Sequence, residues 1–198
     1  ANTGNVSLRK VLVVIQFSLS ILLIIGTIVI YNQLQFIQDK KLGYDKEQVI
    51  QIPIDNRGIA KNKNRFKERL LQNPNIMNVS MMSGVPGGFH DQYDIKVPGQ
   101  AEEDWLTRTV FCDGDMLETL GLELLAGRDF DLKEYKSDLT DAIMINEATL
   151  KRLNWTVDEA LGKSIEVSIR DSLPRKVVGI VKDYNFLSLK EKIEPLII

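Results

Sequence analysis

The apolar and polar residues of this 198-residue chain divide it into two unlike parts. An apolar run extends from Val11 to Ile30, and no charged residue occurs between Lys10 and Asp39. As a helix this run would be roughly 30 Å long, which matches the hydrocarbon core of a bilayer. We therefore predict a transmembrane helix over residues 11–31, after a flank of residues 1–10 and before a folded domain.

A secretory signal would have a shorter apolar region, roughly 7–15 residues, that ends at a cleavage site rich in small residues. Here the run is followed by Tyr31, Asn32 and Gln33, so no Ala-x-Ala-like site is present. A core helix of this length in a soluble protein would carry a charged face, and this one has none. The pattern favours a membrane span.

Polar residues inside the span share one side of the predicted helix. At 100° per residue, Gln16, Ser20 and Thr27 fall within roughly 40° of one another. A glutamine facing lipid is costly, whereas hydroxyl residues suit contacts between helices, so this face is predicted to pack against another transmembrane helix. The alternative is that Ser20 and Thr27 bond to carbonyls of their own helix while Gln16 reaches toward the membrane interface.

Residues 32–45 are predicted to form a stalk that continues the helix beyond the membrane. Gly43 suits the position just after a helix end, where a left-handed conformation is common. We expect Leu42, Gly43 and Tyr44 to form a movable joint between stalk and domain, and the glycine loop from Val85 to Gly88 to be a second movable part. On this hypothesis proline at residue 43 uncouples motion without preventing folding.

The remaining chain mixes short predicted strands with short predicted helices. Strands are expected at residues 48–54, 76–83, 91–100, 105–114, 122–130, 140–145 and 176–182, and helices at residues 62–72, 115–121, 146–153 and 156–161, followed by a tail. The helix starts are marked by Asn146 and by two capping-box pairs, Asp115 with Glu118 and Thr156 with Glu159. Together with the span, this pattern predicts the α+β class.

The charge distribution argues against nucleic acid as a partner. Residues 1–38 contain only Arg9 and Lys10 as charged residues, so the rest of the chain has 23 basic and 27 acidic residues. A mildly acidic, mixed surface has no electrostatic footprint for nucleic acid. The basic residues on the two sides of the span do not decide its orientation.

Few residues of the sequence suggest catalysis or ligand binding. Cys112 is the only cysteine and His90 the only histidine. We expect Cys112 to be a small core residue and His90 to be a plain loop residue. The "LGKS" at residues 161–164 resembles the end of a phosphate-binding loop, but Val157 stands where that motif needs glycine, and the predicted order of elements is reversed. No catalytic, metal or dinucleotide pattern remains, so we predict a tethered binding or coupling domain that is not an enzyme and needs no cofactor.

Four segments carry a family resemblance: "VFCDGDMLETLGLELLAGRDF", "DAIMINEATLKRL", "ALGKSIEV" and "KVVGIVKDYNFLSLKEKIEP". In this order they resemble the periplasmic core domain of MacB/FtsX-type ABC transporter permeases. Residues 7–50 are similar to the transmembrane entry of long permeases of Bacteroidetes-like bacteria.

The resemblance implies a permease segment in a bacterial inner membrane, with Arg9 and Lys10 cytoplasmic and residues 46–198 periplasmic. It implies a porter-like βαβ lobe (46–84 plus 175–198) with a second α/β lobe (85–174) inserted into it. It also implies a separate P-loop ATPase subunit as partner, further transmembrane helices of the same permease, and a dimer. The role would be mechanotransmission, in which ATP-driven helix motion serves substrate export or extraction or acts on a periplasmic partner. The alternative function is a membrane-tethered sensory or solute-binding ectodomain.

Overall fold

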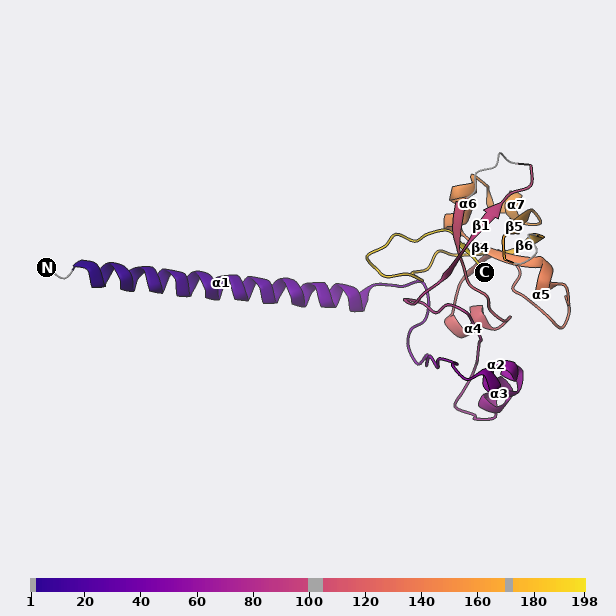
Figure 1. The fold of residues 1–198 in the computed structure, drawn as a ribbon, viewed down its shortest axis with the longest axis horizontal. Coiled ribbons are helices and arrows are strands. Elements are labelled where there is room, and N and C mark those ends of the chain that lie inside the picture. Colours follow the sequence, from indigo (N-terminus) through magenta and orange to yellow (C-terminus); the bar gives the residue numbers. More distant parts are fainter. Residues whose placement is uncertain (1–2, 100–104, 170–172) are drawn as a thin grey trace. The chain divides into compact units, whose positions relative to one another are not determined.

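The computed structural model describes residues 3–99, 105–169 and 173–198. It divides into two units, residues 1–41 and residues 42–198. The first unit contains α1 (Thr3–Asp39), a continuous helix of 37 residues (Figure 1). Its part from Leu8 to Asp39 has a mean hydropathy of 2.6 in its most apolar window and no buried residue there, so it is long and apolar enough to cross a membrane.

The second unit is built on one mixed sheet. Its strands are β1 (Asp91–Lys96), β2 (Trp105–Thr109), β3 (Leu124–Gly127), β4 (Ala142–Asn146), β5 (Ser164–Val167), β6 (Pro174–Val181) and β7 (Leu196–Ile197). The order is β3-β6-β4-β7-β2-β1-β5, and β5 also pairs with β6, so six strands close into a ring with β3 attached to β6. The β4–β6 and β2–β7 pairs are parallel, and the other pairs are antiparallel.

Short helices complete this unit. They are α2 (Arg57–Lys61), α3 (Lys63–Leu71), α4 (Met116–Leu120), α5 (Asp138–Asp141), α6 (Glu147–Leu153) and α7 (Val157–Ala160). Of these, α2 and α3 lie apart from the strands (Figure 1). Helices and a mixed sheet in one domain, after an apolar helix, confirm the predicted α+β class.

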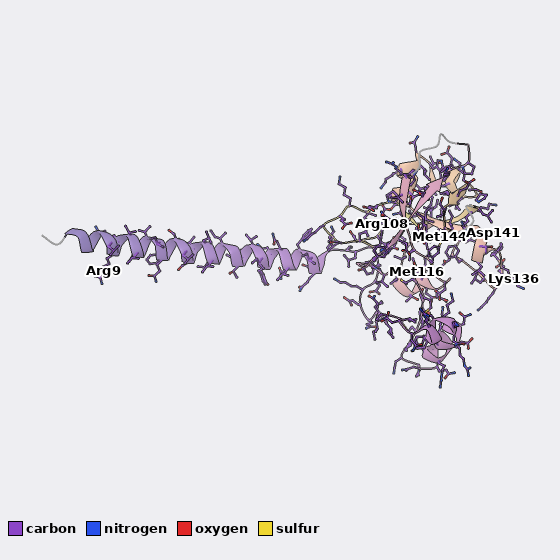
Figure 2. All side chains as sticks on the ribbon, in the orientation of Figure 1. Arg9, Arg108, Met116, Lys136, Asp141 and Met144 are labelled. Carbon is purple, nitrogen blue, oxygen red and sulfur yellow. The ribbon has the colours of Figure 1, made fainter. Side chains whose placement is uncertain are left out.

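Two clusters of buried side chains form the core. One lies between α6, α7 and the strands and includes Ile95, Ile145 and Ile165. The other lies around α4 and includes Met116, Met144 and the residues after β6 (Figure 2). Each fully buried aliphatic side chain contributes roughly 1.5–3 kcal/mol of transfer free energy, so these clusters are what hold the strands together.

Two predicted helix starts are confirmed. The Asn146 side chain accepts a hydrogen bond from the Thr149 amide at 3.0 Å, which caps α6. Thr156 and Glu159 form a complete capping box at α7. The third prediction was wrong in mechanism, because Asp115 precedes α4 without making a side-chain cap and instead pairs with Lys67.

Three other local predictions were wrong. Residues 48–54 form no strand, and in 76–83 only Met82 makes an isolated bridge, to Cys112. Alternating apolar residues specify a strand only when another strand pairs with them, and here none does. The stalk helix ends at Asp39, so Gly43 lies four residues beyond it rather than directly after the helix.

The predicted division into two lobes stays a prediction. β6 and β7 belong by that division to the porter-like lobe. In the structure β6 pairs with β3, β4 and β5, and β7 pairs with β2 and β4, all of which lie in residues 85–174.

Candidate functional site

The predicted joint, Leu42 to Tyr44, is held against the segment that follows β6. The Leu42 carbonyl accepts two hydrogen bonds from Asn185, one from its backbone amide at 2.7 Å and one from its side-chain Nδ2 at 3.1 Å. The Tyr44 ring meets the Tyr184 ring edge-on, with 6.4 Å between centroids. The joint is therefore part of the domain, fixed to it by polar and aromatic contacts.

Gly43 allows this close approach. Its φ is +82°, in the left-handed region that side-chain-bearing residues avoid. A Cβ at this position would lie 2.9 Å from both Cα and Cβ of Tyr184 and 3.0 Å from the Asp183 carbonyl oxygen. The backbone conformation and the contact both require glycine here.

The chain just after the joint is attached to α4. The Asp45 amide donates to the Leu120 carbonyl at 2.7 Å. Gly121 ends α4 in the left-handed conformation with φ +61°, and a Cβ there would lie 3.3 Å from the Cβ of Asp45. Displacement of the joint would thus disturb α4 as well as the segment after β6.

The Asp183–Phe186 segment, whose sequence is "DYNF", connects the joint to the interior of the domain. Tyr184 and Phe186 are buried, and burial raises the pKa of the Tyr184 phenol. Asp183 accepts a hydrogen bond from the Ala148 amide at 2.9 Å, and its own amide donates to Glu147 Oε2 at 2.9 Å. These bonds tie the segment to the first turn of α6. Burial, the largest effect, raises the pKa of Asp183; the Ala148 hydrogen bond opposes it, and the nearby Glu147 carboxylate raises the pKa further.

The glycine loop contacts this same segment. The Gly87 amide donates to the Phe186 carbonyl at 2.9 Å, and the His90 ring meets the Phe186 ring at 5.0 Å between centroids. The two parts predicted to move therefore converge on residues 184–186. Glycines in the sequence indicated the joint and the glycine loop, but no sequence signal indicated the segment that contacts both of them.

His90 lies in a loop, as predicted, but it is not a plain loop residue, because it is buried. Its side chain is 2% exposed, with Nδ1 3.2 Å from the Gly88 carbonyl oxygen. A Cβ on Gly84 would lie 2.9 Å from the imidazole, so glycine at residue 84 makes room for the ring. Burial is the largest effect and lowers the pKa of His90. The hydrogen bond to the Gly88 carbonyl opposes it, the Arg108 charge lowers the pKa further, and Asp91 has a smaller raising effect.

This environment predicts a pH dependence of stability. Because the folded state lowers the pKa of His90, it favours the neutral ring. The stability that this contributes is complete above the unfolded pKa of about 6.5 and is lost progressively as pH falls below that value and through the lower pKa of the folded state. Urea unfolding at pH 7 and pH 5 should show a smaller loss for His90→Gln than for the unaltered protein. Equal losses would contradict the prediction, because every other titrating group is common to both proteins.

The predicted packing face of the span lies on α1. The Ser20 hydroxyl donates to the Gln16 carbonyl at 2.9 Å, and the Thr27 hydroxyl donates to the Leu23 carbonyl at 2.8 Å. Both hydroxyls are therefore satisfied within the helix, as the alternative interpretation expects. Within the described residues no hydrogen bond is recorded for the Gln16 side chain. Packing of Gln16, Ser20 and Thr27 against another helix stays a prediction.

The remaining candidates for chemistry have structural roles. Cys112 packs against the second core cluster, and burial raises the pKa of its thiol, which keeps it in the unreactive protonated form. Lys163 of the "LGKS" turn lies over the Trp155 ring at 4.5 Å. Among the described residues no group of three or more metal-ligating side chains is found.

Sequence reasoning also missed a charged anchor beneath α3. Lys67 Nζ lies 2.7 Å from Asp113 Oδ2 and also pairs with Asp115. Asp113 further accepts from the Ser80 hydroxyl at 2.7 Å and the Met81 amide at 3.2 Å. The pKa of Asp113 is lowered: burial alone would raise it, but the bonds to Lys67, Ser80 and Met81 together outweigh that effect. This anchor joins α3 to the chain before α4.

Some solved structures are similar to this chain, although no family or curated protein matches it. Solved structures similar to it include the periplasmic region of MacB from Actinobacillus actinomycetemcomitans, with 14% identity and a TM-score of 0.47 over 72% of this chain and 69% of that one.

Two further structures are similar. A domain of a protein described as a permease from Porphyromonas gingivalis has 17% identity and a TM-score of 0.40 over 61% of this chain. The extracellular domain of the noncanonic ABC-type transporter YknZ from Gram-positive bacteria has 16% identity and a TM-score of 0.40 over 59%. The matched part spans about half the length of these two domains, 48% and 53%. At such identities and scores, function has to be argued from the residues of this chain.

Proposed function

We propose that this chain is a segment of an ABC transporter permease that couples motion of its membrane helix to its outer domain. The observation that carries the proposal is the joint. Leu42 to Tyr44 follows in sequence a helix able to span a membrane, and it is fixed to the domain by two hydrogen bonds and by a glycine that nothing larger can replace. In this proposal, motion of the helix reaches the domain through this attached segment.

The coupling needs two arrangements whose balance nucleotide binding can change. The Asp183–Phe186 segment is a suitable element, because it contacts the joint, the glycine loop and the start of α6 together. A shift of the joint would therefore change its contacts with this segment and, through it, affect the glycine loop and the start of α6. ATP itself would be hydrolysed by a separate P-loop ATPase subunit, as the family resemblance implies.

In this proposal α1 crosses a bacterial inner membrane with Arg9 and Lys10 in the cytoplasm, and residues 46–198 lie in the periplasm. The face formed by Gln16, Ser20 and Thr27 would contact other transmembrane helices of the permease, which would act as a dimer. The output would be export or extraction of a substrate or an action on a periplasmic partner.

The proposal is tested by purifying the full-length permease from its own membranes. We expect a P-loop ATPase to be recovered in stoichiometric amounts, and its hydrolysis rate to fall when residues 42–198 are deleted. Recovery without an ATPase, but with a kinase or a transcriptional regulator, would instead assign the domain to a sensory receptor.

A further inference from the structure

The segment of residues 57–71, here called the basic hairpin, has a charge unlike the rest of the chain. It consists of α2, Asn62 and α3 and contains six basic residues and one acidic residue, Glu68. Its net charge is thus +5, whereas the whole chain has −2, so all other residues together carry −7. Such a local concentration of one sign attracts the opposite sign.

The basic side chains fall into two groups. Lys67 is turned toward the domain, where it pairs with Asp113 and Asp115 and anchors α3. The other five cations are exposed, and among the described residues none of them has an ion pair; they are Arg57, Lys61, Lys63, Arg65 and Arg69. The anchor therefore leaves five cations free to face outward.

Four of these cations are spaced for recognition of carboxylates. Arg57 and Lys61 are four residues apart, as are Arg65 and Arg69, and residues at this spacing share one face of a helix. Arginine binds a carboxylate through two parallel hydrogen bonds, so it recognises acidic side chains with defined geometry.

Large apolar side chains flank the basic hairpin in sequence and are also exposed. Ile50 is 83% exposed, Ile52 54% and Met77 85%. A combination of arginine, methionine and aliphatic residues is typical of protein interfaces. A surface that binds a membrane would be expected to present tyrosine or tryptophan, but residues 49–77 contain neither, and Phe66 is only partly exposed.

We propose that the basic hairpin and its apolar flanks bind an acidic, amphipathic segment of a partner protein. The glutamate or aspartate side chains of the partner would pair with the arginines, and its apolar side chains would cover Ile50 and Met77. This inference does not depend on coupling to an ATPase, so failure of either experiment leaves the other proposal standing.

The test uses the full chain in phosphatidylcholine nanodiscs and a fluorescently labelled helical peptide of glutamate and leucine, followed by anisotropy. A second peptide of equal charge, with serine for leucine, isolates the apolar part. One variant removes the four spaced cations (Arg57→Gln, Lys61→Gln, Arg65→Gln, Arg69→Gln). A matched variant removes four other exposed lysines (Lys133→Gln, Lys136→Gln, Lys190→Gln, Lys192→Gln), and a third changes the apolar flanks (Ile50→Ser, Met77→Ser).

We expect the hairpin variant to weaken binding of the leucine peptide at least about tenfold, with a change below about twofold for the matched variant. The flank variant should weaken binding of the leucine peptide but not of the serine peptide. Circular dichroism should be unchanged in all three variants, because every altered side chain is exposed.

Equal losses in the two charge variants, or equal binding of the two peptides to the unaltered chain, would overturn the proposal. Absence of peptide binding would overturn it as well. If phosphatidylglycerol vesicles bind through the same four cations while the peptide does not, the surface belongs to a lipid headgroup rather than to a protein.

Discussion

Replacement of Gly43 by alanine is expected to detach the joint from the domain. The left-handed backbone costs a non-glycine residue roughly 1–2 kcal/mol, and the added Cβ would lie 2.9 Å from Tyr184, so the joint must move away. The hydrogen bonds from Asn185 to Leu42 should then open more often. Hydrogen exchange of the Asn185 and Asp45 amides should accelerate about 10–100-fold, because each 1.4 kcal/mol changes an equilibrium tenfold.

Gly99 provides the matched control. Its φ of +84° is nearly the same as that of Gly43, but a Cβ there would meet nothing within 4 Å. Gly99→Ala should leave exchange at Asn185 unchanged. If both variants accelerate it equally, the close contact with Tyr184 is not what holds the joint.

The Gly43 variant also tests the proposed coupling. In the transporter that we propose, Gly43→Ala should allow ATP hydrolysis to continue, but hydrolysis should no longer depend on residues 42–198. Gly43→Ala is a more specific test than the Gly43→Pro substitution suggested by the sequence. Proline fixes φ near −65° and would therefore change the conformation of the whole turn. Normal coupling despite faster exchange at Asn185 would contradict the role of the joint but not its structure.

Helix signals were predictable from sequence because they are local. The caps at Asn146 and Thr156 are decided by side chains within three residues, and the turn glycines Gly121 and Gly162 both have positive φ, as their positions suggest. The long apolar helix α1 was predictable for a related reason: a run of some twenty apolar residues needs no partner to be recognised.

Strands and the candidate site were less predictable because they depend on distant residues. Residues 48–54 alternate as a strand should, yet they pair with nothing, whereas the two-residue strand β7 has little pattern and lies inside the sheet between β4 and β2. The role of Asp183–Phe186 arises from contacts with Leu42 and Gly87, which are about 140 and 100 residues away in sequence. Only the buried aromatic pair of Tyr184 and Phe186 could have indicated it.

The largest effect on stability is expected from Gly127→Ala. Gly127 ends β3 with φ +80°, and a Cβ there would lie 2.2 Å from the Val178 carbonyl oxygen. That oxygen also accepts the Arg128 amide at 2.9 Å, so β3 cannot move from β6 without losing this hydrogen bond. Backbone strain, overpacking and a lost hydrogen bond together should reduce the free energy of unfolding by about 4 kcal/mol.

The measurement is urea unfolding of the chain in detergent, followed by fluorescence of Trp105 and Trp155, which both lie in the domain. Gly99→Ala again serves as control and should lose only about 1 kcal/mol. A second variant identifies the clash that matters, because Leu161 Cδ2 would also lie 2.8 Å from the new Cβ. Shortening this side chain with Leu161→Ala should not restore the stability of Gly127→Ala, since the closest contact is with backbone; restoration would show that side-chain crowding, and not the β3–β6 approach, requires glycine.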